Sequence, residues 1–116
     1  MSEGTASNDP TTTIRAGAPG VAFVNVFTVN PEQQQELVRL LTAFVEEVVR
    51  GMPGFVSANL HRSLDGRRVV NYAQWESAEA LRAMLAHPDS RQHLQRISAI
   101  GEGDPTLCEV VSVHPA

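Results

Sequence analysis

An amide and an indole N–H occur close together in the most distinctive stretch of the sequence, Val69 to Ser77. Its Val, Tyr and Trp residues favour a pleated, half-buried surface, so we interpret residues 67–76 as a β-strand. Side chains alternate between the two faces of a strand, which places Asn71, Ala73 and Trp75 on one face. Two hydrogen-bonding groups on an otherwise apolar wall are typical of the lining of a pocket.

A further amide is expected in the first strand, Val21 to Val29. Asn25 interrupts a face that is otherwise formed by Phe23, Phe27 and Val29. A buried amide that lacks a hydrogen-bond partner costs about 1–3 kcal/mol, so Asn25 needs a partner. The sequence shows no phosphate-binding glycine loop, metal-ligand cluster, paired acids or Ser/His/Asp arrangement. Its candidate chemistry therefore rests on asparagine and tryptophan side chains.

The composition predicts one globular domain. The chain has 116 residues, of which 42% are hydrophobic and 19% charged. Its net charge is −4 and its basic residues are scattered, which argues against nucleic acid or an anionic membrane as partner. The single cysteine, Cys108, excludes an internal disulfide and indicates a reducing cytoplasm, where we expect it buried on a strand. We expect residues 1–20 to form a flexible tail and residues 21–116 to form the domain, without a signal peptide or membrane helix.

Apolar residues at helical spacing predict a helix after the first strand. Asn30 is the expected N-cap, Pro31 occupies the first helical position, and Gly51 ends the helix. The predicted buried stripe consists of Leu37, Leu40, Leu41, Phe44, Val45 and Val48.

A hairpin follows, because a Ser-Leu-Asp-Gly turn separates Phe55–Arg62 from the Asn71 strand. Two registers are compatible with this turn. One pairs Leu60 with Asn71, and the other pairs Asn59 with Asn71 through a bulge at the turn glycine. We favour the second register, because it collects Asn59 and His61 beside the other polar groups.

The remaining sequence predicts a helix capped by Ser77, interrupted at His87-Pro88 and resumed to Ile100, and then a strand at Thr106–Val113. The order strand, helix, strand, strand, helix, strand is typical of an α+β, ferredoxin-like fold with both helices on one face of an antiparallel sheet. The other face keeps many apolar residues. We therefore expect a homodimer in which two such faces close a dimeric α/β barrel.

Three stretches resemble the antibiotic biosynthesis monooxygenase (ABM) family: Phe23-Val24-Asn25, Met52-Pro53-Gly54-Phe55 and Asn71-Tyr72-Ala73-Gln74-Trp75-Glu76-Ser77. The similarity spans roughly residues 21–113 and is greatest to the small anthrone oxygenases of aromatic polyketide pathways. The Pro-Gly-Phe element is shared widely in the dimeric α/β barrel superfamily, whereas the Asn-x-x-x-Trp spacing is more specific.

The resemblance implies a homodimeric, cofactor-independent monooxygenase that oxidises an anthrone or a phenolic polycyclic polyketide to a quinone with O2. No metal or other cofactor is implied, because the deprotonated substrate supplies the electrons. The implied catalytic residues are Asn25, Asn71 and Trp75, which would hydrogen-bond to the substrate or a peroxide and orient the ring. The expected substrate-binding residues are Phe23, Phe44, Asn59, His61, Leu81, Leu85 and Arg96.

The sequence departs from some relatives at Leu81, where they carry a tyrosine proposed to transfer a proton. A helical arginine of relatives corresponds here to Arg96 or Gln95. One alternative is a haem-degrading monooxygenase of the same superfamily, which shares the asparagine and tryptophan but adds a second-helix histidine as iron ligand. The comparable position here is near Leu85, with His87 a little further along. Another alternative is a non-catalytic barrel that binds a small aromatic ligand.

Overall fold

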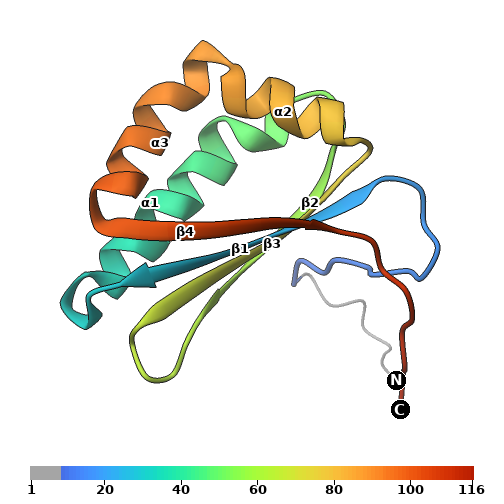
Figure 1. Ribbon diagram of the computed structural model, residues 1–116, viewed down its shortest axis with the longest axis horizontal. Helices are drawn as coiled ribbons and strands as arrows, with labels where there is room; N and C mark the ends of the chain where they lie inside the picture. The colour runs from blue at the N-terminus through green and yellow to red at the C-terminus, as the bar shows by residue number, and fades with distance from the viewer. Residues whose placement is uncertain (1–8) are drawn as a thin grey trace.

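The computed structural model describes residues 9–116, which form a four-stranded antiparallel sheet with its helices on one face (Figure 1). The strand order β2-β3-β1-β4 confirms the predicted α+β, ferredoxin-like arrangement. No helix of the described region is long and apolar enough to cross a membrane. The elements are β1 (Val21–Val29), η1 (Pro31–Gln33), α1 (Gln34–Glu47), η2 (Val49–Gly51), β2 (Phe55–Arg62), β3 (Arg68–Trp75), α2 (Ala78–Ala86), α3 (Pro88–Ile100) and β4 (Gly101–Cys108).

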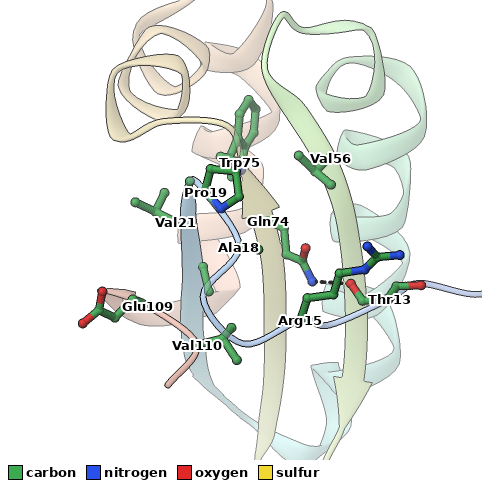
Figure 2. A pocket seen from close by; sticks show the side chains of 12 residues that line it. Thr13, Arg15, Ala18, Pro19, Val21, Val56, Gln74, Trp75, Glu109 and Val110 are labelled. Carbon is green, nitrogen blue, oxygen red and sulfur yellow. Dashed lines mark hydrogen bonds between the residues drawn. The ribbon is translucent and has the colours of Figure 1, made fainter. Parts of the chain in front are cut away.

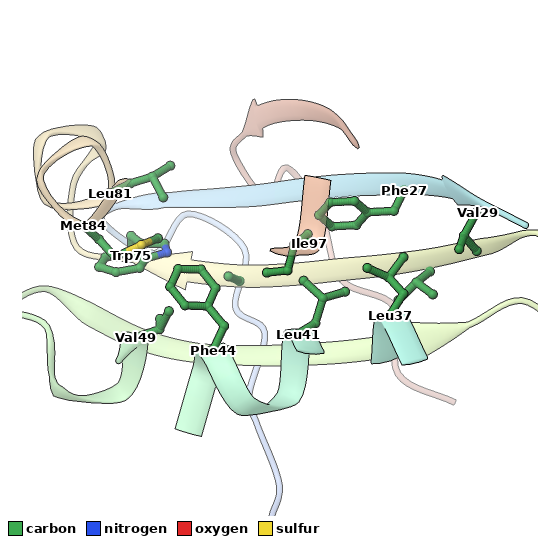
Figure 3. Packing of buried hydrophobic residues seen from close by; sticks show 12 residues of the cluster. Phe27, Val29, Leu37, Leu41, Phe44, Val49, Trp75, Leu81, Met84 and Ile97 are labelled. Atoms are coloured by element: carbon green, nitrogen blue, oxygen red, sulfur yellow. The ribbon is translucent and has the colours of Figure 1, made fainter. Parts of the chain in front are cut away.

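Helix α1 supplies much of the core that lies between the helices and the sheet. The Asn30 side chain accepts a hydrogen bond from the Glu32 amide at 3.0 Å, as expected of an N-cap. Leu37, Leu41 and Phe44 follow at helical spacing and are buried against the strands (Figure 3). The sequence-predicted stripe therefore faces the sheet and fixes the position of α1 over it.

The hairpin adopts the register that we did not favour. Leu60 lies opposite Asn71, whereas Asn59 lies opposite Tyr72 and His61 opposite Val70. A β-bulge between Phe55 and Ser57 then shifts the pairing by one residue at the far end of the strand. Because opposite residues share a face, this register turns Asn59 and His61 away from Asn71.

The second helical region is interrupted where the sequence predicts. Helix α2 ends at Ala86, and His87 caps α3 by accepting a hydrogen bond from the Asp89 amide at 3.0 Å. The buried Ser90 hydroxyl donates to the carbonyl oxygen of Met84 at 2.6 Å and so ties the two helices together. The break therefore bends the chain without separating α2 from α3.

The predicted boundaries of the last strand are wrong. Strand β4 begins at Gly101 rather than Thr106 and ends at Cys108 rather than Val113. Glycine commonly ends a helix, yet Gly101 and Gly103 are strand residues that lie close to core side chains. A Cβ atom at Gly101 would lie 2.9 Å from Cδ2 of Leu37. Cys108, which we expected to be buried, is exposed at the end of β4.

The segment 9–20 lies across the face of the sheet that the helices leave open (Figure 2). The Gln74 amide donates to the carbonyl oxygen of Thr13 at 2.9 Å, and the Thr12 hydroxyl donates to Asn59 at 2.9 Å. The segment forms no helix or strand, and its residues are exposed. Residues 1–8 of the expected tail lie outside the described residues.

We predict that Gly54→Ala destabilises the protein by about 2 kcal/mol, because Gly54 adopts φ +86° and its added Cβ would lie 2.5 Å from the Ala80 Cβ. Urea unfolding measures this change. The matched control is Gly51→Ala, since no atom lies within 4 Å of a Cβ there. Equal unfolding midpoints for the two variants would contradict the prediction.

Candidate active site

Asn25 and Asn71 lie directly opposite each other across β1 and β3, on the face that the helices cover. Trp75 lies on the same face of β3, four residues after Asn71. The three side chains border a cavity of about 60 Å³ between the sheet and the helices, as their alternation along the strands predicts. Their catalytic role stays a prediction. The other lining residues are Phe23, Phe27, Leu41, Phe44, Val45, Val49, Ala58, Ala73, Met84, Leu85, Leu94 and Ile97.

The two amides present unmet hydrogen-bonding capacity to this cavity. The carbonyl oxygens Oδ1 of Asn25 and Asn71 are both buried, and neither has a hydrogen-bond partner among the described residues. Buried polar groups are nearly always paired, and each unpaired one costs about 1–3 kcal/mol. Two such atoms beside one apolar cavity leave hydrogen-bonding capacity that a ligand in the cavity can satisfy.

Trp75 forms a rigid end wall of the cavity. Its side chain is 1% exposed and packs edge-to-face on Phe55, with ring centroids 5.4 Å apart. Figure 3 shows the indole beside Met84 and Leu81 at one end of the buried cluster. The indole orientation is therefore fixed by packing before any ligand enters.

A wider groove of about 420 Å³ adjoins the cavity on the side of α3 and β4. The β4 glycines make room for this groove. A Cβ atom at Gly103 would lie 2.9 Å from Oδ1 of Asn25, so a larger residue would press on the amide. Five residues line both spaces, which makes the groove the outer part of the same site: Asn25, Phe27, Leu85, Leu94 and Ile97.

The inner cavity contains no ionisable side chain in its lining. The groups with shifted pKa values lie elsewhere and are exposed. A hydrogen bond from Arg39 lowers the pKa of Glu36, and a hydrogen bond from the Ser63 hydroxyl lowers the pKa of Asp65. Within residues 9–116, no three His, Cys, Asp or Glu side chains gather as metal ligands. The polarity of the inner site therefore comes from amide and indole dipoles.

Three of the predicted substrate-binding residues, Phe23, Phe44 and Leu85, line the inner cavity. Leu81 is instead a core residue, 2% exposed, and lines neither the cavity nor the groove. At the position where some relatives carry a tyrosine, this chain therefore has an apolar side chain that packs in the core.

The other predicted substrate-binding residues lie away from this site. Asn59 and His61 are on the opposite face of the sheet, because the hairpin takes the other register. Arg96 is exposed and lines neither space, whereas Arg91 and Gln95 line the groove. The sequence analysis did not include Arg91, because it began the last strand at Thr106 and so did not place Gly101 and Gly103 beside α3. The four-residue spacing of Arg91 and Gln95, which puts them on one helix face, is the signal that would have revealed it.

Residues 20–96 match the family model described as antibiotic biosynthesis monooxygenase. The chain is 48% identical over 88 residues to tetracenomycin-F1 monooxygenase of Streptomyces glaucescens, an alignment that covers 76% of this chain and 79% of that protein.

Solved structures agree with this match. A monooxygenase of Streptomyces coelicolor in complex with nanaomycin D has a TM-score of 0.74 and 37% identity, covering 84% of this chain and 94% of that one. SnoaB, a cofactor-independent oxygenase from Streptomyces nogalater, has a TM-score of 0.69 and 30% identity, covering 85% of this chain and 100% of that one.

We predict that Asn71→Leu stabilises the protein by about 1 kcal/mol, because it replaces a buried amide with an unmet oxygen by an apolar side chain of similar size. Urea unfolding again supplies the measurement. The control is Asn59→Leu, which gains nothing because Asn59 already accepts a hydrogen bond from Thr12. A lower midpoint for Asn71→Leu than for the wild type would show that the amide is satisfied in the folded protein.

Proposed function

The chain belongs to the antibiotic biosynthesis monooxygenase family, and we propose that it oxidises an anthrone or a phenolic polycyclic polyketide to a quinone with O2. The observation that carries this proposal is the pair of buried, unpartnered amide oxygens beside Trp75 in an apolar cavity. The cavity, together with the groove that adjoins it, offers apolar walls to an aromatic body and hydrogen bonds to its oxygen substituents. The names of the relatives, two of them monooxygenases and one a cofactor-independent oxygenase, support the same reaction class.

The proposed reaction needs no electrons beyond those of the substrate. Loss of a proton from the activated ring carbon gives a delocalised anion, which transfers an electron to O2. The two radicals then form a carbon–oxygen bond, and a proton converts the product to a hydroperoxide. Loss of water from that hydroperoxide leaves the quinone carbonyl, so one oxygen atom ends in the product and one in water.

The residues at the cavity act on this sequence by hydrogen bonding and by excluding water. The Asn71 amide and the Trp75 indole donate to the ring oxygen as negative charge develops there. The Asn25 and Asn71 carbonyl oxygens accept from phenolic hydroxyl groups and so orient the ring. No ionisable group lines the inner cavity, so the ring proton passes to water or to another oxygen of the substrate.

The direct test is oxygen uptake with a dihydroxyanthrone, with no flavin, metal or nicotinamide added. We expect one O2 consumed for each quinone formed, and about a hundredfold lower kcat/KM for Asn71→Leu and for Trp75→Phe. His61→Ala serves as the control, since His61 lies on the opposite face of the sheet. Tight binding of the anthrone without O2 consumption would instead support a non-catalytic barrel.

We further propose that the protein is a homodimer that pairs through the open face of the sheet. Val24, Val26 and Val70 lie on that face and are only half-buried, although the segment 9–20 covers one end of it. Packing two such faces would remove this apolar surface from water.

Val26→Lys tests the dimer, because it puts a charge on the open face while placing the lysine opposite Asp104 within the same subunit. Sedimentation equilibrium should show a dimer for the wild type and a monomer for Val26→Lys. Leu64→Lys adds the same charge at a fully exposed turn residue and should stay dimeric. A monomeric wild type, or a dimeric Val26→Lys, would contradict the proposal.

A further inference from the structure

The inner cavity is too small to hold a whole polycyclic molecule. Its volume is about 60 Å³, whereas pockets for drug-sized ligands usually measure about 300–1,000 Å³. The adjoining groove, at about 420 Å³, falls within that range. If the reacting ring lies at Asn25 and Asn71, the remaining rings extend into the groove. The residues of the groove then meet the far end of the substrate.

One face of α3 supplies the polar wall of this groove. Arg91, Leu94, Gln95 and Ser98 all line it, and their spacing of three and four residues puts them on one stripe of the helix. Arg96, five residues after Arg91, falls on a different side and does not line the groove. The opposite wall at β4 contributes Gly101 and Gly103, which add no side chain.

The charge of the groove is opposite to that of the protein. The chain has a net charge of −4, yet no carboxylate lines the groove, whereas the Arg91 guanidinium does. Arg39 and Arg50 each pair with a glutamate one turn away on their own helical segment. Among the described residues, no ion pair or hydrogen bond involves the Arg91 guanidinium. Its hydrogen-bonding fork is therefore free to bind a ligand.

We propose that Arg91 is a specificity-determining residue that binds a carboxylate on the substrate ring farthest from the reacting carbon. A guanidinium binds a carboxylate with two parallel hydrogen bonds, a geometry that a lysine does not reproduce. Gln95, one turn further along the same stripe, offers a neutral partner for a neighbouring hydroxyl. This inference rests on the proposed function, because it assumes that the reacting ring lies in the inner cavity.

The test compares two substrates that differ only at the far ring: a dihydroxyanthrone with a carboxylate there, and the same anthrone with a methyl group. Arg91→Gln should raise KM for the carboxylate substrate about tenfold, with little change in kcat, and leave both constants for the methyl substrate unchanged. Arg91→Lys should recover only part of this loss. Arg96→Gln removes the same charge from the same helix outside the groove and should leave kcat and KM unchanged for both substrates.

A binding measurement separates failure of this inference from failure of the proposed function. Trp75 is the only tryptophan and lines the inner cavity, so quenching of its fluorescence by the corresponding anthraquinones reports binding without turnover. The inference is supported if Arg91→Gln binds the carboxylate quinone more weakly than the wild type does and binds the methyl quinone equally well. This holds even if no anthrone is oxidised. Normal turnover with equal effects of Arg91→Gln on both substrates overturns the inference and leaves the oxygenase function standing.

Discussion

The antiparallel register of β1 and β3 is the constraint on which the rest of the site depends. It sets Asn25 directly opposite Asn71, so two amides with unmet carbonyl oxygens share one apolar cavity. A shift of one residue in either strand would move one amide to the open face of the sheet. Buried residues of the same face, among them Phe27 and Val69, hold the register, because that shift would expose them as well.

The cost of the two buried, unpaired amide oxygens is offset by the apolar side chains that pack around them. Leu37 and Val69 are completely buried, and Trp75 nearly so, in a cluster that joins the sheet to α1, α2 and α3 (Figure 3). Burial of side chains of this size contributes about 1.5–3 kcal/mol each, which offsets the cost of an unpaired amide. The free energy of unfolding is therefore lower than an all-apolar core would give. Such a loss of stability is common at sites that bind a ligand.

Local patterns were sufficient to predict β1, β3, α1 and the break at His87, and with them the shared face of Asn25, Asn71 and Trp75. They could not predict the hairpin register, because a bulge between Phe55 and Ser57 changes the pairing along the hairpin. Near the turn Leu60 pairs with Asn71, as in one predicted register, and at the far end Phe55 pairs with Trp75, as in the other. They also predicted the wrong bounds for β4, since glycine usually ends a helix and only tertiary contacts show that Gly101 must approach Leu37 closely. These two errors placed Asn59 and His61 in the site and left Arg91 out of it.

The central claim is that the cavity amides await hydrogen bonds from a ligand, and the most direct measurement follows those amides themselves. The side-chain NH2 resonances of Asn25 and Asn71 can be assigned in nitrogen–proton spectra by single Asn→Asp substitutions. The protein is then titrated with a dihydroxyanthraquinone. The account predicts that both resonances shift together with the Trp75 indole signal, while that of Asn59 on the opposite face does not. Saturating ligand that leaves the Asn25 and Asn71 signals unmoved would contradict it.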